Sequence, residues 1–325
     1  MTLRRRTFLS LAAGAAVLPA TSRTARAQAY PSRPVRIIVG FPPGGATDIM
    51  ARLMGKWLSE RLGQQFIIEN RSGASGNIGT EAVAKSPADG YTLLQVVTPN
   101  AINAALYSNL SFDFVRDIAP VIYLARLAYV VVVHPSVPAA TLPELIAHAK
   151  ANPGKINYGS AGPGTPQNIA CELFKMMASV NLVHVPYRGG APAVTDLVGG
   201  HLQVIFCPVS ECIEHVKTGR LRALAVTPAK RLDVFPDVPS MGDIVPGYEA
   251  SGFAGIGVPK GTPAEIIDLL NKELNAALAD PKIRQRITEL GGTPVGGSPA
   301  EFGTLVSDAI EKWTKVIKFA GIKVE

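Results

Sequence analysis

The residues best suited to chemistry in this 325-residue chain are glycines, hydroxyl side chains and backbone amides at points where strands give way to helices. The first such segment, GFPPGGATD at 40–48, separates a β-branched run at 35–39 from a helical pattern at 46–62. Its prolines stiffen the turn, and its glycines let the backbone approach another molecule closely. The first N–H groups of a helix carry partial positive charge and bind anions. The segment therefore predicts an anion site, or alternatively a plain turn in which Asp48 caps the helix.

A second segment, YGSAGPGTPQN at 158–168, has the same order of strand, small-residue loop and helix. Ser160 and Thr165 add hydroxyl donors to its backbone amides. The alternative is that Thr165 and Pro166 form an ordinary helix cap and first-turn proline. Because the two segments fall in different halves of the chain, they suggest a ligand held between two lobes.

A third segment, HVPYRGG at 184–190, ends a strand and begins a helix. Tyr187 is a candidate pocket residue there. We interpret Arg188 as solvent-facing, because the glycines that follow it supply backbone contacts of their own.

Motifs for catalysis and for metal binding do not occur in the sequence. Neither G-x-S-x-G nor a complete G-x-G-x-x-G is found, and no Walker A motif is present. The five histidines lack the spacing of metal ligands. We therefore expect no catalytic residue, no metal and no cofactor.

Strands and helices alternate along most of the chain, which predicts an α/β fold with mostly parallel sheets flanked by helices. Helical patterns dominate after 263, and a helical tail cannot form a lobe alone, so we expect it to pack on the first lobe. The predicted domains are a discontinuous first lobe at 28–129 and 251–325, and a second lobe at 130–250.

Residues 1–27 have the pattern of an export signal. Three arginines at 4–6 precede an apolar stretch at 11–18, and Ala25-Arg26-Ala27 forms a cleavage site. We expect cleavage after Ala27, by the twin-arginine route or by ordinary Sec export. A membrane anchor is the weaker alternative, because a spanning helix needs about 20 apolar residues.

Export also changes the meaning of the charge. The whole chain has a formal charge of +7, but five of its arginines lie within 1–27, so the mature chain carries +2. This near-neutral balance argues against nucleic-acid binding. The three cysteines, Cys171, Cys207 and Cys212, permit one disulfide in an oxidising compartment, and we interpret all three as buried free thiols.

Seven segments, in this order and at these distances, resemble the periplasmic receptors of tripartite tricarboxylate transporters, also called the Bug family. They are FPPGGATDIMAR (41–52), ENRSGASGNIGTEAVAKSPADGYTLL (69–94), YGSAGPGT (158–165), HVPYRGGAPAVTDLVGG (184–200), GRLRALAVT (219–227), FPDVPSMGD (235–243) and VPKGTPAEIIDLLNKEL (258–274). The resemblance implies a two-lobed Venus-flytrap fold of the type II kind that closes on its ligand by hinge motion. It further implies a monomeric periplasmic protein that binds a small carboxylate (di- or tricarboxylate, amino acid or aromatic acid) and delivers it to membrane permease subunits.

The resemblance and the three segments together predict fifteen ligand-binding residues. They are Phe41, Pro43, Gly44, Gly45, Ala46, Thr47, Asp48, Thr98, Ser160, Gly164, Thr165, Asn168, Tyr187, Gly189 and Cys207. Two positions depart from the family pattern: Asn168 stands where a histidine is usual, and Phe253 where a tryptophan is usual.

Three functions are compatible with these patterns. A transport receptor is favoured by export, two lobes, paired glycine-rich helix starts and the lack of catalytic motifs. A ligand carrier for a membrane sensor would use the same closed surface. A periplasmic enzyme is the third and least favoured possibility.

Overall fold

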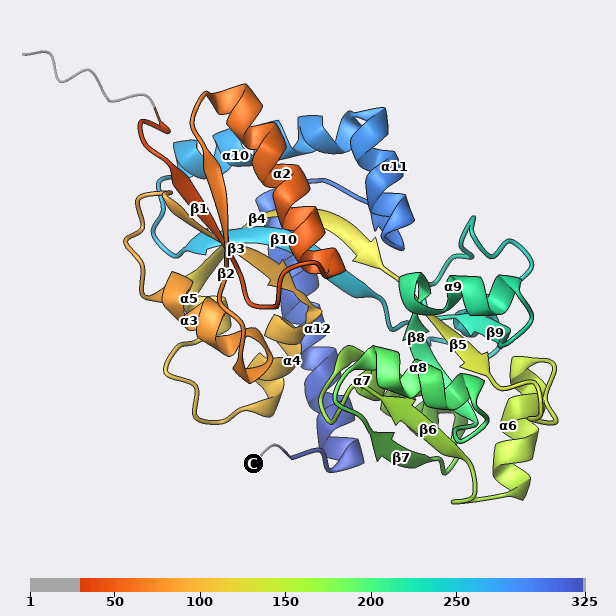
Figure 1. Ribbon diagram of the computed structural model, residues 1–325. Coiled ribbons are helices and arrows are strands. Elements are labelled where there is room, and N and C mark those ends of the chain that lie inside the picture. The colour runs from red at the N-terminus through yellow and green to blue at the C-terminus, as the bar shows by residue number, and fades with distance from the viewer. Residues whose placement is uncertain (1–29, 324–325) are drawn as a thin grey trace, which may run out of the picture.

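Two α/β lobes make up the part of the chain that the computed structural model describes, residues 30–323 (Figure 1). The expected export signal at 1–27 lies outside these residues. One sheet of six strands has the order β11-β4-β10-β3-β1-β2, and one of five strands has the order β7-β6-β8-β5-β9. The two-lobed α/β prediction is confirmed.

The first sheet and its helices come from both ends of the chain. Before the second sheet come β1 (Val35–Val39), α2 (Ala46–Leu62), β2 (Phe66–Asn70), α3 (Asn77–Ala84), β3 (Thr92–Val97), α4 (Thr98–Leu106), α5 (Phe114–Asp117) and β4 (Ile118–Leu127). After it come β10 (Gly252–Pro259), α10 (Ala264–Ala279), α11 (Pro281–Glu289), β11 (Gly292–Pro294) and α12 (Pro299–Ala320).

The second sheet and its helices form one continuous stretch between β4 and β10. They are β5 (Tyr129–Val133), α6 (Leu142–Ala151), β6 (Asn157–Ser160), α7 (Pro166–Ala178), β7 (Val183–Pro186), α8 (Gly190–Val198), β8 (Val204–Pro208), α9 (Val209–Lys217) and β9 (Arg222–Val226). Within the described residues, no helix is long and apolar enough to cross a membrane.

Both sheets are mixed, so the prediction of mostly parallel sheets is wrong. In the first sheet, β1 pairs in parallel with β2 and β3, but β10 is antiparallel to β3 and β4. In the second, β6 is parallel to β7 and β8, but β5 is antiparallel to β8 and β9. The reason is the double crossing between lobes. A strand that follows a crossing, such as β5 or β10, must run away from the neighbouring lobe, whereas its neighbours run toward it.

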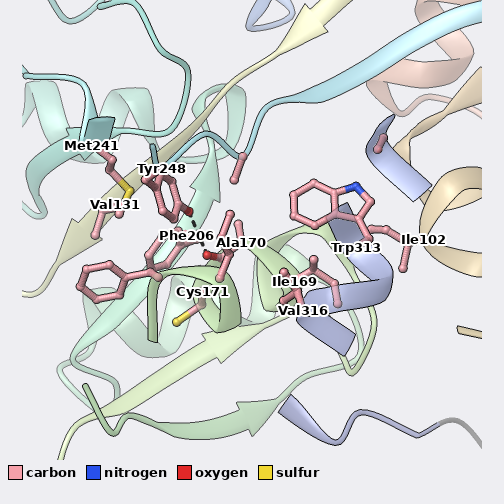
Figure 2. Packing of buried hydrophobic residues seen from close by; sticks show 14 of the residues in the cluster. Ile102, Val131, Ile169, Ala170, Cys171, Phe206, Met241, Tyr248, Trp313 and Val316 are labelled. Carbon is pink, nitrogen blue, oxygen red and sulfur yellow. Dashed lines mark hydrogen bonds between the residues drawn. The ribbon is translucent and has the colours of Figure 1, made fainter. Parts of the chain in front are cut away.

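The hydrophobic core does not stop at the boundary between the lobes. One cluster lies between the first sheet and α2, α10 and α11, and another lies between the second sheet and α8 and α9. The largest cluster runs through both lobes along α4, α7 and α12. Figure 2 shows Trp313 and Val316 of α12 beside Ile102 of α4 and Ile169 of α7.

The C-terminal helices therefore differ from the expectation. Helices α10 and α11 pack on the first lobe as predicted, but α12 also packs against α7 of the second lobe. The long helix lies along both lobes on the side of α4 and α7 (Figure 1). The residues of α12 thus hold the two lobes together on the side of α4 and α7.

Candidate ligand-binding cleft

A cavity of about 400 Å³ lies between the two lobes and is lined by residues from both. Strands β3 and β4 of the first lobe end at it, as β8 of the second lobe does, and β5 begins there. Ligands of α/β proteins bind beyond the carboxyl ends of strands in this way.

Five helices begin at the cavity wall, and this convergence sets its electrostatic character. The lining includes first-turn residues of every one of them: Ala46 and Thr47 of α2, Thr98 and Pro99 of α4, Pro166 and Gln167 of α7, Gly190 of α8, and Val209, Ser210 and Glu211 of α9. Each helix start contributes partial positive charge and N–H groups that lack partners within the helix. No Lys, Arg or His is among the described lining residues. The wall is therefore built to attract negative charge through backbone dipoles.

The loop before α2 is held by Asp48. Its carboxylate accepts hydrogen bonds from the Gly44 backbone N–H and from Arg52 Nε, both at 2.9 Å, and from Asn70 Nδ2 at 2.9 Å. Burial alone would raise the pKa of Asp48, but the hydrogen bonds from Arg52, Gly44 and Asn70 outweigh burial and hold the pKa below its usual value. The amides of Ala46 and Thr47, in contrast, have no hydrogen bond to any described residue. Asp48 fixes the loop, and the next amides are left for a ligand.

The loop before α7 repeats this arrangement with an amide in place of the carboxylate. Asn168 Oδ1 accepts a hydrogen bond from the Gly164 N–H at 2.9 Å, four residues earlier, as Asp48 does from Gly44. Asn168 Nδ2 donates to the buried Tyr158 hydroxyl at 2.7 Å, and that hydroxyl donates to Glu172 at 2.5 Å. The Thr165 hydroxyl donates to the Gly162 carbonyl at 2.7 Å and does not cap the helix. Of the first amides of α7, that of Gln167 has no partner among the described residues.

Six of the fifteen predicted residues line the cavity, and nine lie behind or beside it. Those in the lining are Phe41, Ala46, Thr47, Thr98, Gly164 and Thr165. Those outside it are Pro43, Gly44, Gly45, Asp48, Ser160, Asn168, Tyr187, Gly189 and Cys207.

The residues outside the lining are mostly engaged with the protein itself. The Ser160 hydroxyl is bonded to the Gly162 carbonyl at 3.0 Å and to His184 Nε2 at 2.7 Å. The Tyr187 hydroxyl donates to Asp196 at 2.7 Å, and the side chain packs against the core of the second lobe. Cys207 is fully buried, because alternate side chains of β8 point into the core of the second lobe. These side chains support the loops.

Pro43, Gly44 and Gly45 are exposed in the turn before α2 and are not part of the cavity lining. Gly189 precedes α8 with φ near +120°, and it is the next residue, Gly190, that reaches the lining.

Several lining residues were missed by sequence reasoning, among them Tyr129, Gln167, Ser210 and Glu211. Ser210 and Glu211 lie in the first turn of α9, shortly after the end of β8, and that position is the signal that could have found them. Glu211 is the one charged side chain among the described lining residues. Solvent can reach it, but the cleft walls partly desolvate it, and this burial raises the pKa of its carboxyl. Burial, and then the Glu211 charge, raise the pKa of the Tyr129 phenol.

The lobes touch at both edges of the cavity. At one edge, a Cβ placed on Gly164 would lie only 2.6 Å from Leu106 Cδ2 of α4. At the other, a Cβ placed on Gly291 would lie 3.4 Å from the backbone nitrogen of Ser210. Glycine at these positions permits the close approach of one lobe to the other.

Two lobes on mixed sheets, joined by two crossings and enclosing a cavity lined by helix starts, define a solute-binding protein of the Venus-flytrap kind. The family model of the tripartite tricarboxylate transporter family receptor matches residues 50–322, and the chain belongs to that family. The protein BugT of Bordetella pertussis is 37% identical over 302 residues, which cover 92% of this chain and 93% of BugT.

Two solved structures show the same architecture. R. palustris Rpa4515 with adipate is 38% identical, with a TM-score of 0.79 over 90% of this chain and 99% of that one. MatC (Rpa3494) from Rhodopseudomonas palustris with bound malate is 28% identical, with a TM-score of 0.75 over 89% of this chain and 100% of that one.

Proposed function

We propose that this protein captures a small organic acid between its lobes in the periplasm and delivers it to the permease subunits of a tripartite tricarboxylate-type transporter. The observation that carries the proposal is the convergence of five helix starts on one cavity whose described lining has no cationic side chain. Such a wall favours an anion through dipoles and N–H donors. The adipate and malate bound by two relatives are small carboxylates and support this ligand class.

In this proposal the ligand carboxylate accepts hydrogen bonds from the free amides of Ala46 and Thr47 in one lobe and of Gln167 in the other. The first lobe comprises 28–129 and 251–325, and the second 130–250, after removal of 1–27. Because donors come from both lobes, a bound carboxylate favours the closed arrangement over the open one.

A thermal-shift screen over a broad panel of carboxylates tests the proposal. A cognate acid at about 100 times its Kd should raise the free energy of unfolding by about 2.7 kcal/mol. Stabilisation by neutral compounds and by no acid would overturn the anion assignment.

A substitution at the start of α2 tests the amide donors directly. Ala46 is the first helical residue after the extended Gly45, a position where proline is well tolerated. Ala46→Pro removes one N–H donor and should weaken binding of the cognate acid, while the ligand-free stability stays near that of the native chain. Ala46→Ser keeps the N–H and serves as the matched control. Equal affinity in both variants would show that this amide does not bind the ligand.

A further inference from the structure

Glu211 places a negative charge at one end of the cavity, whereas the helix starts give the rest of the wall partial positive charge. It lies in the first turn of α9, and its carboxylate rests against Gly190 at the start of α8, where an added methyl group would collide with it. The remaining described lining residues carry no formal charge. The negative charge of the protein itself therefore already occupies the helix starts of α8 and α9.

The carboxylate of Glu211 is not engaged as neighbouring acids are. Asp48 behind the first loop is paired with Arg52 at 2.9 Å, and Glu172 behind the second is paired with Lys175 at 2.8 Å. Among the described residues, none forms a hydrogen bond or an ion pair with the Glu211 side chain. The residue is exposed to solvent, and the cleft walls desolvate its carboxyl only in part, which raises the carboxyl pKa. An acceptor held in this way is available to a ligand.

We propose that Glu211 selects ligands that carry a hydrogen-bond donor, above all an ammonium group, at the end opposite the carboxylate. This inference rests on the proposed function and narrows it. The ligand carboxylate binds at the starts of α2 and α7, and the far end of the ligand meets Glu211 at the starts of α8 and α9. A second carboxylate at that far end would lie beside a like charge with no lining cation to offset the repulsion.

Isothermal titration calorimetry at pH 7 with matched probes tests the selection. At four and at six carbons, each series keeps one carboxylate and varies only the far end: butanoate, succinate, 4-hydroxybutanoate and 4-aminobutanoate, and then hexanoate, adipate, 6-hydroxyhexanoate and 6-aminohexanoate. The proteins are the native chain, Glu211→Gln, and Glu214→Gln as the control. Glu214 lies on the same helix and pairs with Lys217 at 3.2 Å, but it is outside the cavity lining.

The native chain should bind the amino form more tightly than the dicarboxylate in the series that fits. Glu211→Gln should weaken binding of the amino form by about tenfold or more, as expected for loss of a charged hydrogen bond, and should strengthen binding of the dicarboxylate. Glu214→Gln should change neither.

Two failures are distinguishable. Tight binding of a dicarboxylate by the native chain, or an unchanged preference in Glu211→Gln, overturns the role of Glu211 and leaves the proposed function standing. Absence of binding by every acid in both series and in the broader carboxylate screen overturns the proposed function, and the role of Glu211 with it.

Discussion

Replacement of Gly164 by alanine should weaken ligand binding by a calculable amount, because this residue is a point of contact between the lobes. Two costs are expected. Alanine at φ near +72° is strained by about 1–2 kcal/mol. In addition, its Cβ would lie 2.6 Å from Leu106 Cδ2 of the other lobe, so Leu106 must leave its preferred rotamer or the lobes must part.

Gly219 provides a control that separates these costs. It has the same φ of 72° and lies in the same lobe, but a Cβ there would meet nothing within 4 Å. Gly219→Ala therefore carries the backbone strain alone. The rotamer change of Leu106 adds about 0.5–1.5 kcal/mol to Gly164→Ala, and only when the lobes are closed. The affinity of Gly164→Ala should thus fall by about 2- to 12-fold, and that of Gly219→Ala should not change.

Titration calorimetry with the best acid from the screen measures the affinities, and urea denaturation measures the strain. Both variants should lose a similar free energy of unfolding without ligand. The double variant Gly164→Ala, Leu106→Ala removes the opposing methyl group and should recover the affinity of Leu106→Ala alone. Equal affinities of Gly164→Ala and Gly219→Ala, or no recovery in the double variant, would refute the assignment of this contact to the closed cleft.

Three further predictions concern the core, the second loop and pH. Trp313→Ala should lower the free energy of unfolding by about 3–5 kcal/mol in urea denaturation. Trp313→Phe should lower it less, because it keeps a packed ring and removes the buried Nε1, which has no partner among the described residues. Equal losses in the two variants would argue against this packing role. Asn168→Ala leaves the Gly164 N–H without its acceptor and removes the donor to the Tyr158 hydroxyl, which keeps its bond to Glu172. The variant should lose about 1–3 kcal/mol of stability and bind the ligand more weakly in calorimetry. An unchanged affinity would show that Asn168 does not position the loop. Glu211→Gln should be more stable than the native chain at pH 7 in urea denaturation, because partial desolvation raises the folded-state pKa of Glu211 and its ionisation therefore favours the unfolded chain. The difference in stability should disappear as the pH falls below 4.5, the ordinary pKa of a glutamate. A variant less stable than the native chain at pH 7 would contradict this direction of the pKa shift.

The helix starts at the cleft were predictable because their signals are local. Glycine, proline and hydroxyl residues after a β-branched run mark the turn before α2 and the turn before α7 whatever the rest of the chain does. The strand β4 was not predicted, because Pro120 and Arg126 interrupt its apolar pattern. Its identity as a strand depends on pairing with β10, which lies more than a hundred residues away.

The cavity lining was predictable only in part, for a related reason. A glycine-rich loop before a helix predicts free backbone amides, but it does not show which of these amides will donate to side chains of the following helix. Asp48 and Asn168 each accept a hydrogen bond from the glycine amide four residues earlier, so the amides left for a ligand lie two or three residues after that glycine. The only local signal for Glu211 is its position shortly after the end of β8. Its place follows from the packing of α8 against α9, which only the folded chain displays.

The position of α12 has a consequence for the order in which the molecule acquires its structure. Residues of this helix, such as Phe302, Trp313 and Val316, complete the core of both lobes, and they lie at 299–320, after every strand in the chain. During synthesis, the cluster that runs through both lobes along α4 and α7 cannot close until this helix is available. The two lobes should therefore reach their final packing together, late and through contacts of long sequence separation, which fold slowly.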